Sequence, residues 1–231
     1  LTRSKGRIDS VLDGRTDGLV FIAPQPDSPA LLAARDRGIP HTVISTHVDW
    51  APCVTGDNDA GVALALGHLY ELGHRRIAHV AGNLDHEDAR ARLAAYRAFA
   101  AESGVEPVVY EGDFTPGAGE AAVERWLRRS DRSTAFFCAN DDTALGAVLG
   151  ARKAGVSVPG DLSVVGYDDA FFAPFLDPPV TTVRQCMGEM GAAAAVALFR
   201  LLSGETPSLV PFIPRLVVRT STDRPKADIP S

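Results

Sequence analysis

Short apolar segments alternate with longer amphipathic segments along most of the chain. The apolar segments are rich in Val, Ile, Leu and Phe, which is typical of buried strands. We expect these strands at 17–23, 41–45, 76–81, 108–111, 135–139 and 162–166. The amphipathic segments carry helix signals, such as Ser28 and Pro29 at a start and Gly38 at an end. We expect these helices at 28–38, 58–73, 87–104, 117–129, 142–154 and 187–202.

This repeated strand and helix order predicts an α/β fold, in which parallel sheets are covered by helices on both faces. Strands covered on both faces should be almost wholly apolar, and the expected ones are. After Asp169 the regularity weakens, and only short strands are expected at 181–183, 210–213 and 216–218. The 231 residues suffice for one large domain or for two small lobes, each with its own core.

Composition and charge exclude several classes of protein. The net charge is −6 and the basic clusters are short, so we do not expect this chain alone to bind nucleic acid. A run of about 18 apolar residues, as a membrane span needs, does not occur. The three cysteines form no CxxC pair, which argues against a zinc site or a disulfide framework and favours a reducing cytoplasm. Cys138 lies in an apolar segment, and we expect it to be a buried thiol.

Polar and aromatic side chains follow several of the expected strands. In doubly wound sheets, ligands bind beyond the carboxyl ends of the strands, so these residues are candidates for a site. They are Asp57 and Asn58, Phe114, Asn140 to Asp142, Asp168 and Asp169, and Arg92 one turn into its helix. Each also has a purely structural interpretation. Asp and Asn before a helix are common N-caps. Asp168 and Asp169 would suit a simple turn. Arg92 could be a solvated helix residue, and Phe114 could belong to the core.

In combination, these residue types suit a neutral polyol such as a sugar. Carboxylates accept hydrogen bonds from hydroxyls, and the planar Arg guanidinium donates a pair of hydrogen bonds to adjacent oxygens. An aromatic ring packs on the apolar face of a pyranose or purine. Such a set binds without reacting. A nucleophile and base at recognisable spacing, a GxSxG, an HExxH and a Walker loop are all absent from the sequence, so we expect neither an enzyme nor a cofactor or metal.

Many longer motifs resemble the effector-binding region of the LacI/GalR family of transcription regulators. They occur in family order over nearly the whole chain, and LGHRRIA, ANDDTALGA and the pair VPGDLSVVGYDD and PPVTTVRQ are individually specific. The matching segments are TDGLVF (16–21), GIP (38–40), GDNDAG (56–61), HLYELGHRRIAHVAG (68–82), RARLAAYRAF (90–99), GDFT (112–115), AFFCANDDTALGA (135–147), AGVSVPGDLSVVGYDD (154–169), PPVTTVRQ (178–185), MG (187–188) and PRLVVRTST (214–222).

The resemblance implies a periplasmic-binding-protein-like fold of type I, with two doubly wound lobes and a ligand cleft between them. By matching, the chain crosses between lobes near 73–74, 184–185 and 213–214. The first lobe then comprises 1–73 with 186–213, and the second comprises 74–184 with 214–231. Family members carry a DNA-binding head and a first strand before the helix in which this chain begins. We therefore expect a first lobe that is truncated at its N-terminus, and a longer natural protein.

The resemblance also implies site residues and partners. The matched ligand contacts are Asp57, Arg92, Phe114, Asn140 and Asp168. Further candidates are His86 and Asp88, in a stretch that varies with ligand identity, and Gln185 at a crossing. The implied protein is a cytoplasmic, homodimeric repressor. Its sugar or nucleoside-like effector controls operator binding by a separate helix-turn-helix head.

Two alternatives belong to other classes. A periplasmic sugar-binding protein of a transporter shares the fold, but the LGHRRIA and PRLVVR motifs favour the regulator. An enzyme could use Asp141, Asp142, Asp168 and Asp169 as a magnesium site, because Mg²⁺ favours carboxylates. No phosphate-binding glycine loop accompanies these residues in the sequence, so we expect this alternative to fail.

Overall fold

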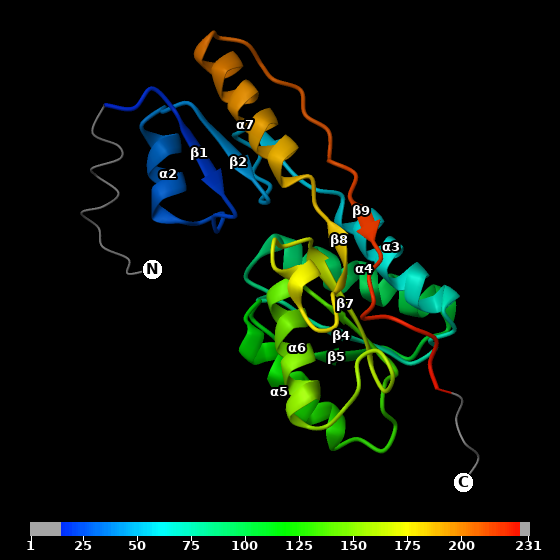
Figure 1. The fold of residues 1–231 in the computed structure, drawn as a ribbon. Helices are drawn as coiled ribbons and strands as arrows, with labels where there is room; N and C mark the ends of the chain where they lie inside the picture. Colours follow the sequence, from blue (N-terminus) through cyan, green and yellow to red (C-terminus); the bar gives the residue numbers. More distant parts are fainter. Residues whose placement is uncertain (1–14, 227–231) are drawn as a thin grey trace. The chain divides into compact units, whose positions relative to one another are not determined.

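The computed structural model describes residues 15–226 (Figure 1). Within this part, the six longer apolar segments are strands and the six amphipathic segments are helices. The strands are β1 (Leu19–Ile22), β2 (His41–Ile44), β3 (Cys53–Val54), β4 (Ile77–Val80), β5 (Val108–Tyr110), β6 (Ala135–Cys138), β7 (Ser163–Asp168), β8 (Thr181–Arg184) and β9 (Arg215–Val217). The helices are α2 (Pro29–Asp36), α3 (Asn58–Glu71), α4 (Glu87–Ser103), α5 (Pro116–Leu127), α6 (Asp141–Lys153), the short η1 (Ala173–Phe175) and α7 (Met187–Leu202). The expectations for the start of the chain lie outside the described residues.

One expected strand is wrong. The segment 210–213 forms only an isolated bridge, between Phe212 and Gly56. Prolines at 207, 211 and 214 interrupt this stretch, and proline has no N–H to donate to a strand ladder. Val210 and Ile213 are accordingly exposed. β3 and η1 were not expected, because each is only two or three residues long.

The described chain divides into two compact units. Unit 1 contains the residues up to Gly56 together with Cys186–Phe212, and unit 2 contains Asp57–Gln185 together with the residues from Ile213 onward. The expected first crossing, near 73–74, differs from the division at 56–57. Helix α3 accounts for the difference, because its apolar side chains pack with Ile77, Leu93 and Tyr96 of unit 2.

In unit 1, three parallel strands lie in the order β1-β2-β3. Alternate residues of β2 point to opposite faces, as a strand requires. Ile44 packs with Met190 and Ala194 of α7, while Val43 packs with Leu31 of α2. Unit 1 is thus a parallel sheet with a helix on each face, as the resemblance implies.

In unit 2, six strands lie in the order β5-β4-β6-β7-β8-β9, and all neighbours are parallel except β8 and β9. One face packs against α3 and α4, and the other against α5 and α6 (Figure 1). β4 illustrates the alternation of side chains: Ile77 packs in the core beneath α3 and α4, whereas Ala78 and Val80 pack in the core beneath α5 and α6. Cys138 is fully buried in the core beneath α5 and α6, as expected for a buried thiol, and burial raises the pKa of this thiol. None of the helices within residues 15–226 is long and apolar enough to cross a membrane.

Candidate functional site

The order of strands in unit 2 creates a switch point between β4 and β6. From β4 the chain continues through α4 to β5 on one side, and then returns through α5 to β6 on the other side. The two connections therefore diverge beyond the carboxyl ends of β4 and β6. This is where doubly wound sheets bind ligands. Six of the eight predicted site residues lie beside the ends of β4 to β7 or in the first turns of a following helix. Asp57 precedes α3, which follows β3, and Gln185 directly follows β8.

Arg92 lies at the centre of this region and is only 2% exposed. Its Nε donates to Asn58 Oδ1 at 2.9 Å, and its Nη1 donates to the backbone carbonyl of Ala139 at 2.6 Å. The guanidinium also lies over the ring of Tyr167, 3.8 Å from the ring centre. The structure therefore excludes the interpretation of Arg92 as a solvated helix residue. A buried charge with this many partners is held in one orientation.

Two carboxylates flank the Arg92 guanidinium. Asp88 Oδ2 lies 3.8 Å from Nη2, and Asp168 Oδ1 lies 3.9 Å from Nη1. Both distances are too long for a direct hydrogen bond. Asp88 also accepts from Asn58 Nδ2 at 2.8 Å, so Asn58 connects it to Arg92. The side chains of Asp88 and Asp168 remain 20% and 37% exposed, so an approaching ligand can reach their oxygens.

Asp57 and Asn140 both cap helices, which was the structural interpretation open to Asp57. Asp57 Oδ1 accepts from the Ala60 amide at the start of α3. Asn140 Oδ1 accepts from the backbone and side chain of Thr143 at the start of α6, while its Nδ2 donates to the carbonyl of Phe114. Capping does not remove either residue from the site, but it fixes one side-chain oxygen of each.

Phe114 and His86 form an aromatic pair at the ends of β5 and β4. Their rings meet edge to face, with centres 5.9 Å apart. Phe114 has a φ of 68°, a strained left-handed conformation for a bulky residue. Its ring occupies the space over Gly82, where a Cβ would lie 2.3 Å from the ring carbons. Gly82 therefore lets the ring approach the backbone beside the other candidate residues.

Gln185 and Asp169 connect the site to the last strands. Gln185 Nε2 donates to Asp168 Oδ1 at 2.6 Å, so this predicted residue does meet the site. Asp169 accepts from Arg184 and Arg219, which ties β7 to the neighbouring strand and to the segment after β9. For Asp169, burial acts to raise the pKa, but the two arginines outweigh it and hold the pKa below its usual value. Asp169 thus has a structural role, as the sequence suggested.

Two carboxyl groups at this edge of the sheet have raised pKa values. Asp141 is 1% exposed, and burial raises its pKa to about 7, although its bonds from Thr182 and the Ala170 amide act in the opposite direction. Burial also raises the pKa of Asp168, while Arg92 and Gln185 partly offset this effect. Gly166 permits the burial of Asp141, since a Cβ there would lie 2.1 Å from its Oδ1.

These contacts also bear on the proposed magnesium site. Asp141 and Asp169 direct their oxygens at protein donors rather than at a shared point. Among residues 15–226, no group of three His, Cys, Asp or Glu side chains has the geometry to hold a metal ion. The arrangement is instead a set of acceptors, one buried cation and an aromatic wall.

Two contributors were missed by sequence reasoning, and the role of a third was left open. Asn58 was a candidate with capping as its alternative, and it joins Asp88 to Arg92. Tyr167 supports the guanidinium, and the Ala139 carbonyl accepts from it. The signal available for Tyr167 was its position directly before the candidate Asp168. A backbone carbonyl leaves no signal in a sequence.

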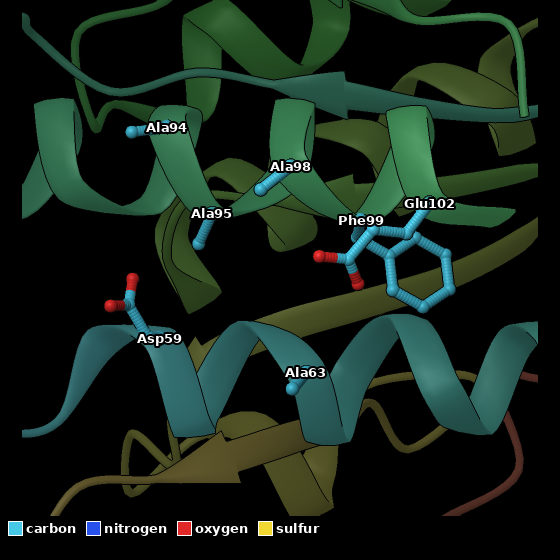
Figure 2. A pocket seen from close by; sticks show the side chains of 7 residues that line it. All are labelled: Asp59, Ala63, Ala94, Ala95, Ala98, Phe99 and Glu102. Carbon is cyan, nitrogen blue, oxygen red and sulfur yellow. The ribbon is translucent and has the colours of Figure 1, made fainter.

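A separate pocket of about 350 Å³ lies between α3 and α4. Figure 2 shows alanines on both helices, with Asp59 toward one end and Phe99 and Glu102 toward the other. Its lining is mostly methyl groups and one ring, and it includes none of the predicted site residues. Ligand sites need a few convergent polar groups to fix orientation, and this pocket lacks them. We therefore place the candidate site around Arg92.

Comparison with known proteins identifies the family of this chain. A family profile described as a periplasmic binding protein-like domain matches residues 66–222. The ribose operon repressor of Escherichia coli K12 is 34% identical over 214 residues, covering 88% of this chain and 64% of the relative. The chain spans about two thirds of the length of the curated relatives that it matches.

Solved structures give the same result. A LacI transcriptional regulator from a Rhodococcus species has a TM-score of 0.88 and 30% identity, covering 96% of this chain and 84% of its own. A complex of the transcriptional regulator CelR with cellobiose has a TM-score of 0.84 and 34% identity, covering 94% and 69%. Sequence and fold therefore agree, and the chain belongs to the periplasmic-binding-protein-like domains of the LacI/GalR family of transcription regulators.

Proposed function

We propose that this chain is the ligand-sensing region of a LacI-type transcriptional repressor, and that it binds a small polar effector, a sugar, around Arg92. The observation that carries this proposal is the pair of gaps beside the guanidinium. Asp88 and Asp168 lie 3.8 and 3.9 Å from its nitrogens, at distances that a ligand hydroxyl can bridge. The ring of Phe114 would pack on the apolar face of such a ligand.

The relatives support a sugar in particular. One is named for the ribose operon, and one solved structure contains cellobiose. Both are named as regulators of transcription, which favours a repressor over a binding protein of a transporter. The site would bind its ligand without converting it, because the groups around Arg92 are acceptors and a ring rather than a nucleophile with its base.

The activity of the whole protein is a further part of the proposal. The effector would change the affinity of a helix-turn-helix head for operator DNA, in a cytoplasmic homodimer. Such control requires only that the effector bind one arrangement of the protein more tightly than another. The involvement of the first unit in the site stays a prediction.

Thermal unfolding of this chain tests ligand binding directly. A ligand at 100 times its Kd stabilises a folded protein by about 2.7 kcal/mol, which is easily measured. We expect a stabilising hit among ribose, glucose, galactose, cellobiose and nucleosides. Asp168→Asn should remove the shift, whereas Asp49→Asn, at a side chain that is 97% exposed, should retain it. A shift that survives Asp168→Asn would contradict the proposed site.

Operator binding is tested separately with the full-length protein. DNA fragments from upstream of its own gene serve as probes in a mobility-shift titration. The compound that stabilises the sensing region should change the operator affinity at least several-fold, and Asp168→Asn should make the affinity insensitive to it. A hit that binds this chain but leaves operator affinity unchanged would contradict the regulatory part of the proposal.

A further inference from the structure

The backbone turns sharply at the end of β7, beside the proposed ligand. Asp168 has a φ of 112° and Asp169 has a φ of 57°, so two consecutive residues with side chains lie in the left-handed region. Residues with a Cβ adopt positive φ rarely and at an energetic cost. Contacts from outside the turn must therefore hold it, and the turn sets the direction in which Asp168 presents its carboxylate.

Asp169 anchors this turn through both of its carboxylate oxygens. Its Oδ1 accepts from Arg219 Nη2, and its Oδ2 accepts from Arg184 Nε. The side chain of Arg184 is 56% exposed, whereas those of Arg219 and Asp169 are only 14% and 9% exposed. Because water screens an exposed ion pair, the pair with Arg219 is the stronger of the two anchors.

Arg219 is itself fixed against the start of β8. Its Nη1 donates to the carbonyl of Val180 at 2.7 Å, and its backbone amide donates to Thr181 Oγ1 at 2.9 Å. One planar guanidinium thus bridges β8 and the turn after β7, with a different nitrogen on each side. The single ammonium group of a lysine cannot reproduce this geometry.

Asp168 depends on the turn for its orientation. Its Oδ1 accepts from Gln185 at 2.6 Å and lies 3.9 Å from Arg92 Nη1, and its side chain is 37% exposed. Groups that bind a ligand keep a productive geometry only when neighbouring hydrogen bonds fix them. A rotation of the turn would move the carboxylate and change the gap that a ligand hydroxyl has to bridge.

Resting on the proposed function, we infer that Arg219 is a positioning residue of the effector site, which acts through Asp169 to direct the Asp168 carboxylate at a ligand hydroxyl. Arg219 itself does not touch the ligand. Its influence should end at Asp168, because Asp88 belongs to α4 and is held by Asn58 instead. The two carboxylates beside Arg92 therefore respond differently to a change at Arg219.

Calorimetric titration of this chain with deoxy sugars resolves the two carboxylates. The probes are ribose, glucose and galactose, each with its series of monodeoxy analogues. For a sugar that binds, loss of the hydroxyl at Asp168 or of the hydroxyl at Asp88 should each raise the Kd roughly tenfold, as for a hydrogen bond to a charged group. Asp88→Asn should reduce one of these two penalties, which assigns the other to Asp168.

Arg219→Lys keeps the charge but removes the hold at two points. We expect it to reduce the penalty at the Asp168 hydroxyl from roughly tenfold to about twofold, and to leave the penalty at Asp88 near tenfold. A purely structural role would instead weaken the sugar and all its analogues by the same factor. Asp169→Ala removes the acceptor for Arg219 and should give the same pattern, so the test does not depend on the folding of one variant.

Arg129→Lys is the matched control. It makes the same substitution in an ion pair with Asp131, just beyond the end of α5. Both penalties should survive it.

The remaining outcomes separate this inference from the proposed function. If Arg219→Lys leaves both penalties intact, or reduces both equally, Arg219 does not position Asp168 and the inference is wrong, but the sugar site stands. If ribose, glucose, galactose and cellobiose all fail to bind the wild-type chain, the proposed sugar effector is wrong and the inference fails with it.

Discussion

The guanidinium of Arg92 lies 3.8 Å from the centre of the Tyr167 ring, and the two side chains come from different elements, α4 and β7. Asn58 from α3 and the Ala139 carbonyl after β6 complete the surroundings of the guanidinium. Four segments of unit 2 thus meet at one buried charge. The ligand-binding residues around it depend on this packing for their positions.

Replacing Tyr167 should affect both stability and binding. Tyr167→Leu removes the ring under Arg92, and we expect a loss of about 2–4 kcal/mol in the free energy of unfolding, as for other large core truncations. Cation–π contacts contribute about 0.5–2 kcal/mol, so the Kd of a stabilising sugar should rise roughly 2- to 30-fold. Urea unfolding and calorimetric titration measure the two effects.

Tyr167→Phe is the control for this prediction, because it retains the ring and should keep the Kd within about twofold of the wild-type value, given that the cation–π contact is to the ring face. A Kd that stays constant in Tyr167→Leu while stability falls would show that Tyr167 supports the core alone and does not position Arg92.

Gly82→Ala should displace the ring of Phe114. A Cβ at this position would lie 2.3 Å from the ring carbons, so the ring or the backbone must move. We expect about 1–3 kcal/mol of destabilisation, the usual cost of overpacking, together with weaker sugar binding. Gly117→Ala is the matched control, since a Cβ there would meet Thr115 Oγ1 at an ordinary 3.6 Å. Equal effects of the two substitutions on the Kd would contradict the role of Phe114.

Phe171 and Phe175 should contribute to self-association. They are 85% and 83% exposed, and their rings lie beside and within η1 of unit 2. Large exposed aromatic side chains are typical of interfaces between proteins. The double substitution Phe171→Ser and Phe175→Ser should shift the chain toward monomer in sedimentation velocity without lowering its thermal stability. Phe199→Ser, at another exposed phenylalanine, in α7, is the control. Monomer formation by the control alone would place the interface elsewhere.

The sequence was sufficient for the longer elements of the fold, because burial on two faces leaves a direct pattern. Segments such as 135–139 are wholly apolar, and helix ends carry glycines, as at Gly104 and Gly155, which both have positive φ. Local chemistry also predicted the Ser28 cap, whose side chain accepts from Leu31. These features depend on residues that are close in sequence.

Features that depend on distant packing were harder to predict. The pattern of α3 shows an apolar stripe but does not say which sheet covers it. The crossing was therefore expected near 73–74, whereas the units divide at 56–57. Asn58 is a residue type that favours helix N-caps. Only the packing of α4 beside α3 lets it form hydrogen bonds with both Asp88 and Arg92. The candidate residues were thus found from their positions after strands, whereas their partners required the structure.

The titration of Asp141 should make stability depend on pH. Its pKa is raised from 3.8 to about 7, so the folded state retains a proton that the unfolded state releases. The resulting stabilisation is complete below pH 3.8 and is lost as the pH rises through about 7. Asp141→Asn removes this titration. We expect the free energy of unfolding of the wild type, relative to Asp141→Asn, to fall between about pH 4 and pH 7 and to level off above this range.

Urea unfolding at intervals across this range measures the difference, in which other titrations cancel. His68, His74 and His79 have pKa values lowered chiefly by burial, so their contribution to stability rises with pH, but it is common to both proteins. Asp169→Asn is the control. The pKa of Asp169 is lowered below 3.8, so its stabilisation is lost only at more acidic pH and should be constant across this range. Parallel curves for the wild type and Asp141→Asn would mean that the buried carboxyl group does not titrate near neutral pH.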